Sequence, residues 1–294
     1  MTGPKLHHHS SRLLPDASGA LVNITAAEAR WDFIDFNVRR LARGERWTGS
    51  SGGHEVCLVL LQGSCTVSWN GESPRKLGPR DNVFAGYPHA VYLPAGTAFA
   101  LEALTTTEIA DCRAPSEKAG APRVVAPEDC GFEIRGGGNA TRQIVDILPP
   151  GFPADRLLIC EVYTPGGNWS SYPPHKHDVD EPPIENDLEE IYYFRMKRPE
   201  GYAFQRIYRG DGSFDQTFMV RDGDLLLIRD GYHPFVTAYG FDAYYLNVLA
   251  GERRSMAARD DPAYAEFRTQ WPAPDPRLPL LPHPSSVHGG RARG

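Results

Sequence analysis

The chain has 294 residues, of which 23% are charged and 41% hydrophobic, and a formal net charge of -6. A negative chain whose Lys and Arg are scattered among acids is not expected to bind nucleic acid. No apolar run approaches the length that crosses a membrane, and the N-terminus lacks the apolar segment of a signal peptide. The five cysteines are widely spaced, which predicts buried thiols in a reducing cytoplasm and no disulfide framework. The sequence is compatible with a homo-oligomer and does not define the oligomeric state.

In the first half, a short helix is expected over residues 26–30 and a strand over residues 33–38. From residue 55 the chain consists of short β-rich runs separated by turn residues, among them Asn70-Gly71, a strong tight-turn signal. Runs of this kind predict an antiparallel sandwich or barrel. They are EVCLVLLQG, SCTVSW, NVFAG, AVYLPAG, TAFALEAL and TEIADC.

A passage rich in Pro, Ala and charge near residues 115–130 separates this half from a second β-rich half. We expect an N-terminal unit over residues 1–120, a C-terminal unit over residues 121–271 and a Pro-rich tail over residues 272–294. EVCLVLLQG in the first half matches EIYYFRM in the second, which indicates a weak twofold repeat. Near the end, Asp261 followed by Pro262 predicts the start of a helix.

The residues that carry chemistry gather in the second half. His175 and His177 are two apart, a spacing that places both side chains on one face of an extended segment. Glu189 and Glu190 open an aromatic run, and His233 stands in GYHP. Neutral imidazoles and a carboxylate from neighbouring strands form a ligand shell for a divalent metal ion with open positions. Adjacent strand residues face opposite sides, so only one of the two glutamates can join the histidines.

This arrangement on repeated β-runs resembles the cupin superfamily. More narrowly, YTPGGNWSSYPPHKHD, LEEIYYF, GYAFQRIY, GYHP and YYLNVLAG are similar to the bacterial 5-deoxy-glucuronate isomerase family of inositol catabolism, IolB. The resemblance implies an all-β bicupin with one metal ion, Zn, Mn, Fe or Ni, in its C-terminal cupin. It also implies that the ligands are His175, His177, His233 and either Glu189 or Glu190, with a preference for Glu189 taken from related 4-deoxy-uronate isomerases.

The first half holds His54, Glu55 and His89 at the equivalent places but no pair of histidines two residues apart. We therefore expect a degenerate, metal-free cupin there.

The resemblance further implies ring opening and aldose-ketose isomerisation of a small-molecule uronate, 5-deoxy-D-glucuronate, to 5-dehydro-2-deoxy-D-gluconate. The metal would polarise the carbonyl and stabilise an enediolate while a general base moves the proton. Arg206 is the first candidate to bind the substrate carboxylate, the alternative being an ion pair with the acidic loop before Glu189. Candidates for the base are the glutamate that does not bind metal, Asp178, Tyr192, Tyr232 and Tyr245.

Two other classes of protein are alternatives, and the first of them uses the same ligand set. An iron-dependent cupin dioxygenase would consume oxygen and require Fe(II). A non-catalytic sugar-binding cupin would bind without turnover, and an intact ligand set would then be unnecessary.

Overall fold

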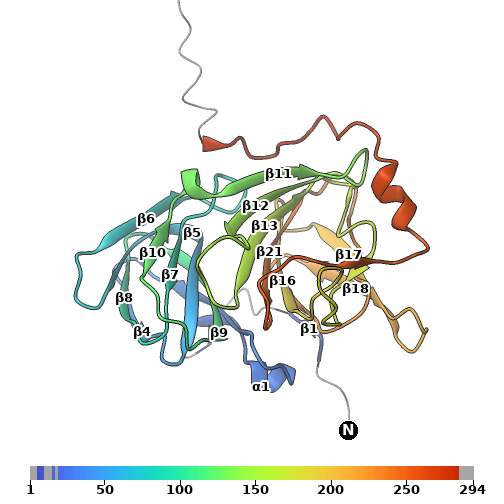
Figure 1. Cartoon of the computed structure of the whole chain (residues 1–294). Helices are drawn as coiled ribbons and strands as arrows, with labels where there is room; N and C mark the ends of the chain where they lie inside the picture. Colours follow the sequence, from blue (N-terminus) through green and yellow to red (C-terminus); the bar gives the residue numbers. More distant parts are fainter. Residues whose placement is uncertain (1–4, 10–14, 17–18, 285–294) are drawn as a thin grey trace, which may run out of the picture.

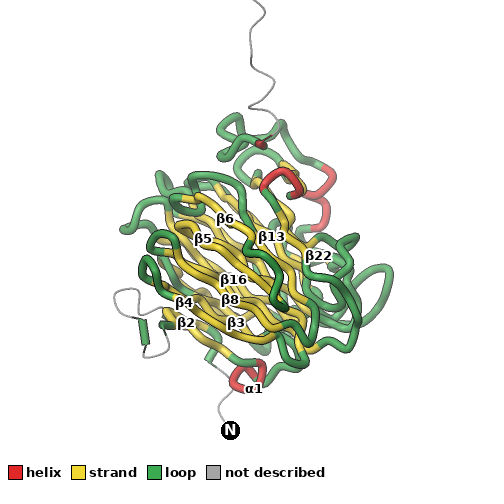
Figure 2. The backbone as a smooth tube through the Cα atoms, turned by 90° about the vertical axis from the view of Figure 1, so that its left-hand side faces the viewer, coloured by secondary structure: helices red, strands yellow, loops and turns green. Residues whose placement is uncertain are grey.

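The computed structural model describes residues 5–9, 15–16 and 19–284. Strands form most of its regular structure and build two β-sandwich halves that lie side by side (Figure 1). Helical segments are short and lie at the edges of the sheets (Figure 2), and none in the described ranges is long and apolar enough to cross a membrane. The expected all-β architecture in two halves is confirmed. The helical segments described are α1 (Ala26–Ala29), η1 (Pro127–Asp129) and η2 (Ala265–Thr269).

The first half is organised around β5, a long strand that takes part in both of its layers. The beginning of β5 pairs with β7 and β9, and the part from Gly63 onwards pairs with β6 and β8. Gly63 has a φ of +91°, and a Cβ there would lie 2.3 Å from the carbonyl oxygen of Thr106, so this bend requires glycine. The strands are β2 (Ala20–Ile24), β3 (Asp35–Leu41), β4 (Arg46–Ser50), β5 (His54–Trp69), β6 (Arg75–Arg80), β7 (Ala90–Leu93), β8 (Ala98–Ala103), β9 (Thr107–Pro115) and β10 (Arg123–Val125).

The second half combines a seven-stranded sheet, in the order β1-β19-β16-β21-β13-β12-β11, with a four-stranded sheet, β14-β20-β17-β18. The N-terminal strand β1 pairs with β19, so the beginning of the chain crosses to the second half. A small ladder joins β15 to β22. The strands are β1 (His7–His8), β11 (Gly131–Arg135), β12 (Arg142–Leu148), β13 (Leu158–Thr164), β14 (Trp169–Ser170), β15 (His175–Lys176), β16 (Glu189–Met196), β17 (Tyr202–Tyr208), β18 (Asp215–Arg221), β19 (Leu225–Ile228), β20 (Phe235–Thr237), β21 (Ala243–Ala250) and β22 (Arg259–Asp260).

The seven-stranded sheet buries both of its faces, in two different cores. Alternate residues of β16 enter different cores because successive strand side chains point in opposite directions. Ile191 and Tyr193 belong to the cluster between the halves, whereas Tyr192 and Phe194 belong to the cluster inside the second half. The ring of Tyr193 lies 5.8 Å from that of Phe36 in the first half. The same alternation decides where the two glutamates at the start of β16 point.

Two buried carboxylates join the halves reciprocally. Glu189 of β16 accepts the backbone N–H groups of residues 32–34 at 2.6, 3.0 and 2.9 Å. Glu55 of β5 accepts those of residues 155–157 at 2.7, 2.7 and 2.6 Å. The two glutamates hold corresponding places, so the internal repeat aligns Glu55 with Glu189. The expected match of EVCLVLLQG with EIYYFRM aligned Glu55 with Glu190, so the observed alignment differs from it by one residue.

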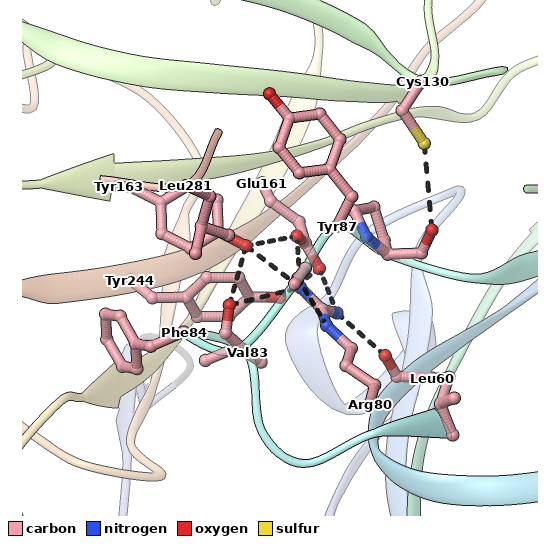
Figure 3. Close-up of polar contacts among 12 residues, drawn as sticks. Leu60, Arg80, Val83, Phe84, Tyr87, Cys130, Glu161, Tyr163, Tyr244 and Leu281 are labelled. Carbon is pink, nitrogen blue, oxygen red and sulfur yellow. Dashed lines mark hydrogen bonds and ion pairs between the residues drawn. The ribbon is translucent and has the colours of Figure 1, made fainter. Parts of the chain in front are cut away.

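A buried ion pair also connects the halves (Figure 3). Arg80 of β6, which is 2% exposed, donates from both terminal nitrogens to Glu161 of β13 at 2.8 Å each. The hydroxyls of Tyr163 and Tyr244 donate to the same carboxylate at 2.6 and 3.0 Å. Burial disfavours the charged guanidinium, but the charge of Glu161 outweighs it and raises the pKa of Arg80. Each carboxylate oxygen of Glu161 thus has two donors.

The C-terminal part departs from the helix expected at Asp261. The chain there forms turns and the short segment η2, and no α-helix is described. The Asp261 carboxylate accepts the backbone N–H of Ala263 at 2.9 Å and the hydroxyl of Tyr208 at 2.5 Å, which holds a turn. The Pro-rich segment then packs on the second half as far as Leu281, whose backbone bonds the side chain of Gln143. Residues 285–294 of the expected tail lie outside the described residues. The five cysteines are free and buried, as expected.

Candidate metal centre

The three candidate histidines converge inside the second half. His175 lies in β15, His177 follows directly, and His233 lies between β19 and β20. The Nδ1 atom of each ring lies 3.0 to 3.1 Å from a backbone carbonyl oxygen. An Nδ1–H that donates there leaves the lone pair on Nε2, the form in which imidazole binds a metal. The acceptors are the carbonyl oxygens of Pro173 for His175, Leu188 for His177 and Gly231 for His233.

The carboxylate of Glu190 lies among these rings. Its Oε2 is 2.9 Å from Nε2 of His177 and 3.2 Å from Nε2 of His233. The ligand atoms of these three residues lie within 4.8 Å of one another, and the ring of His175 is 4.9 Å from that of His233. Nε2 of His233 is buried and has no hydrogen-bond partner among the described residues. A buried nitrogen that makes no hydrogen bond, beside a carboxylate and two imidazoles, fits a divalent cation.

The electrostatics of the cluster also suit a cation. Burial alone would raise the pKa of Glu190, but His233 and His177 lower it to about 2. Burial lowers the pKa of both His175 and His233. Burial opposes protonation of His177 too, but Glu190 outweighs it and raises the pKa of that ring. An ionised carboxylate beside two imidazoles whose pKa values are lowered by burial suits metal binding, which needs an anionic carboxylate and neutral imidazoles.

The preference for Glu189 over Glu190 needs correction. Glu189 is 2% exposed and points away from the histidines, toward the backbone N–H groups of residues 32–34 in the first half. Because Glu190 is the next residue on the same strand, its side chain points to the opposite face, where the histidines lie. Because of the pleat of β16, the carboxylate of Glu189 binds the first half, whereas the carboxylate of Glu190 lies in the histidine cluster.

Asp178 lies outside the cavity and supports the loop that carries His233. Its Oδ2 accepts the N–H of Gly231 at 2.8 Å, and its Oδ1 pairs with Lys176. Gly231 has a φ of +86°, and a Cβ there would lie 2.6 Å from the carbonyl oxygen of Tyr208. This placement does not suit Asp178 as a base acting on substrate.

A cavity of about 630 Å³ adjoins the cluster. Tyr192 and Tyr245 line it with stacked rings 4.2 Å apart, and the ring of Tyr192 is 6.2 Å from that of His233. Tyr232 is not among the lining residues and packs on Tyr208 instead, at 5.2 Å. Burial raises the pKa of Tyr192, and raises that of Tyr245 to about 12, so both hydroxyls stay protonated at neutral pH.

Arg206 does not reach this cavity, which corrects its expected role. It lines a separate cavity of about 480 Å³ and makes a two-point ion pair with Asp215, at 2.8 Å for both contacts. Its guanidinium also lies 4.0 Å from the centre of the Tyr208 ring. The alternative, a structural ion pair, describes it better, although its partner is Asp215 and not the acidic loop.

Four charged residues of the main cavity wall were not among those predicted from the sequence: Arg135, Arg142, Asp146 and Arg268. Of these, Arg142 and Asp146 belong to β12. They alternate with Gln143 and Val145, so they share the face of the sheet that holds Glu190. Burial raises the pKa of Asp146. The run RQIVDIL shows the alternation, but only the strand order shows that this face meets the histidines.

The fold and the site together define a bicupin: two β-sandwich halves, with a histidine-glutamate cluster inside one of them. Oxalate decarboxylase from Bacillus subtilis shares this fold, with a TM-score of 0.60, 14% identity and coverage of 88% of this chain and 80% of that one.

The family model described as KduI/IolB matches residues 7–267, and the chain belongs to the KduI/IolB family. A 5-deoxy-glucuronate isomerase from Geobacillus kaustophilus is 42% identical over 249 residues, which cover 84% of this chain and 90% of that protein. The protein of the same name from Bacillus subtilis strain 168 is 38% identical over 243 residues, with coverage of 82% and 90%. The crystal structure of an IolB-like protein from Salmonella typhimurium LT2 matches with a TM-score of 0.85 and 36% identity over 90% of this chain and 99% of that one.

Proposed function

We propose that this chain is a 5-deoxy-glucuronate isomerase of inositol catabolism, which converts 5-deoxy-D-glucuronate to 5-dehydro-2-deoxy-D-gluconate. The observation that carries the proposal is the 42% identity to a protein of that name, over most of both chains. The cluster of imidazoles and a carboxylate beside a polar cavity supports the same activity.

We assign the metal to His175, His177, Glu190 and His233, with Zn, Mn, Fe and Ni as the ions to test. Supporting this are the three Nδ1 contacts to carbonyl oxygens and the buried Nε2 of His233, which makes no hydrogen bond to a described residue. A bound divalent ion would supply Lewis-acid polarisation of the substrate carbonyl and its neighbouring hydroxyl.

The cavity tyrosines are suited to donate hydrogen bonds to substrate oxygens, because a phenol with a raised pKa is a donor and a poor base at neutral pH. Tyr192 is held through Ser171 at 2.7 Å and Tyr245 through Ser170 at 3.1 Å. Aldose-ketose isomerisation also needs a base that moves a proton between adjacent carbons. Asp146, the carboxylate that lines the cavity outside the cluster, joins the candidates for that role.

For the first half we propose a degenerate cupin that binds no metal, within the division into residues 1–120, 121–271 and 272–294. Glu55 is occupied by backbone N–H groups, as Glu189 is. His54 stands 3.7 Å from Asp35, with its side chain 36% exposed. A cytoplasmic location is part of the proposal and is supported by the buried free thiols.

The proposal is tested by NMR analysis of the product after incubation with 5-deoxy-D-glucuronate, with metal content measured on the same protein. We expect 5-dehydro-2-deoxy-D-gluconate to form, turnover to fall more than about 100-fold after chelation, and the missing metal to restore it. Protein reconstituted in turn with Zn, Mn, Fe and Ni that still forms no product would reject the proposal. Oxygen uptake with Fe(II) would indicate a dioxygenase instead, and binding without turnover a sugar-binding cupin.

Replacement of Arg206 by methionine is expected to change KM for the uronate by no more than roughly twofold, because an exposed ion pair outside the cavity contributes little. Steady-state kinetics on Arg206→Met measure this directly. A tenfold higher KM with unchanged kcat would instead show that Arg206 takes part in substrate binding.

A further inference from the structure

Arg142 is a buried cation that has no acidic partner among the residues that the structure describes. It is the first residue of β12 and is 4% exposed. One terminal nitrogen donates to the carbonyl oxygens of Tyr172 at 3.0 Å and Ala140 at 3.5 Å. The structure gives it no ion pair with any described carboxylate. Taking a charge out of water without a counter-charge is strongly unfavourable, which makes such a group exceptional in a folded protein.

The surroundings of Arg142 add positive potential. Burial is the main reason that its pKa is lowered, to about 10, and Arg135 and Arg268 lower it further. At neutral pH the guanidinium is still charged. An anion that enters the cavity would therefore meet a largely buried cation that makes no ion pair with a described carboxylate.

The other arginines of the cavity wall differ in this respect. Arg135 pairs with Glu133 at 2.7 Å, and Arg268 pairs with Asp260 at 2.5 Å. Their charges are compensated by these carboxylates. Among the described arginines of the cavity wall, Arg142 is therefore the one that makes no ion pair.

Arg142 lines the same cavity as the histidine cluster. The carbonyl oxygen that it binds belongs to Tyr172, and the preceding residue, Ser171, bonds the hydroxyl of Tyr192 at 2.7 Å. The ring of Tyr192 in turn faces that of His233. One short run of chain thus links the guanidinium to the cluster, and both groups line the same cavity.

We propose that Arg142 forms an anion subsite of this cavity, which binds the carboxylate of a sugar acid whose other end lies at the histidine cluster. The proposal rests on the proposed isomerase function for the orientation of the substrate. The subsite explains specificity for an acid over a neutral sugar, because a guanidinium fork matches a carboxylate in both charge and shape.

The test compares two probes of similar shape, D-glucuronate and its neutral amide D-glucuronamide, by calorimetric titration of the metal-loaded protein. Wild-type protein should bind the acid at least about tenfold more tightly than the amide. Arg142→Met should weaken binding of the acid about 10- to 100-fold and leave binding of the amide and the metal content unchanged. The ratio of the two affinities, acid to amide, should then approach one. Arg206→Met, which removes an arginine that already has an acidic partner, should keep the wild-type ratio.

Arg142→Lys and Arg142→Gln keep the test decisive if the methionine variant does not fold. Both retain a donor for the carbonyl oxygen of Tyr172, but only lysine retains the charge, so lysine should keep part of the preference for the acid and glutamine should lose it. An acid-to-amide ratio that stays at the wild-type value without the positive charge, or that is already near one in wild-type protein, overturns the subsite.

The outcomes separate this subsite from the proposed function. If wild-type protein prefers the acid through Arg142 but forms no isomerised product, the subsite stands and the isomerase proposal falls. If product forms normally in Arg142→Met and the binding ratio is unchanged, the isomerase proposal stands and the subsite falls.

Discussion

Glu190→Gln is expected to lose bound metal and isomerase turnover together, each by more than about 100-fold, which is beyond the 10- to 100-fold typical of residues that only orient a ligand. The physical reason is that the amide removes the negative charge that faces the rings of His177 and His233. Metal content per chain and NMR of the product measure the two effects on one preparation.

Glu189→Gln is the matched control, because it makes the same chemical change one residue away on the opposite face of β16. It should retain metal and turnover but lower the free energy of unfolding by about 1–3 kcal/mol, since a buried carboxylate that accepts three backbone N–H groups is replaced by a weaker acceptor. Denaturant unfolding measures this loss. The reverse pattern, with metal lost from Glu189→Gln and kept in Glu190→Gln, would show that our assignment of the ligand is wrong.

Arg80→Met is expected to destabilise the protein by about 3–5 kcal/mol, because it leaves the fully buried Glu161 without its cation. The Tyr163 and Tyr244 hydroxyls remain as donors but bring no charge (Figure 3). The midpoint of urea unfolding should fall accordingly, and the loss should spread across both halves because the pair joins β6 to β13.

The double variant Arg80→Met/Glu161→Gln should recover part of this loss, since it removes the unpaired charge as well. The control is Arg253→Met, which breaks an exposed pair with Asp180 and should leave the unfolding midpoint unchanged. Equal midpoints for Arg80→Met and Arg253→Met would mean that the buried pair does not hold the halves together.

Local sequence was enough to predict much of this molecule. Short runs bounded by Gly, Pro and Asn-Gly indicated antiparallel sandwiches, and strands lie close to where most of those runs were expected. The run NVFAG is an exception, because residues 82–86 form turns between β6 and β7. The two-residue spacing of His175 and His177, with His233 in a separate turn, indicated that these histidines meet at one site, and the structure brings the three rings together. Motifs in order along the chain indicated the family. Strand periodicity, turn residues and motif order are properties of neighbouring residues, so they can be read without knowing how the strands pair.

What sequence could not decide depends on which strands are neighbours and which face each presents. Glu189 and Glu190 are identical residues next to each other in the sequence. Only the packing against the first half shows that Glu189 accepts the backbone N–H groups of residues 32–34. Arg206 stood in a conspicuous motif but lies over a different cavity. Arg142 stands far from the histidines in the sequence, and strand order places it on the wall of their cavity.

Sequence by itself therefore determined the fold class and the family of this protein, and it indicated which histidines lie together. Tertiary structure decided which glutamate lies beside the histidines and which arginine of the cavity has no acidic partner in the described part of the chain. The physical reason is that a side chain's chemistry is carried by its own residue, whereas its burial and its partners are set by chain segments that folding brings together.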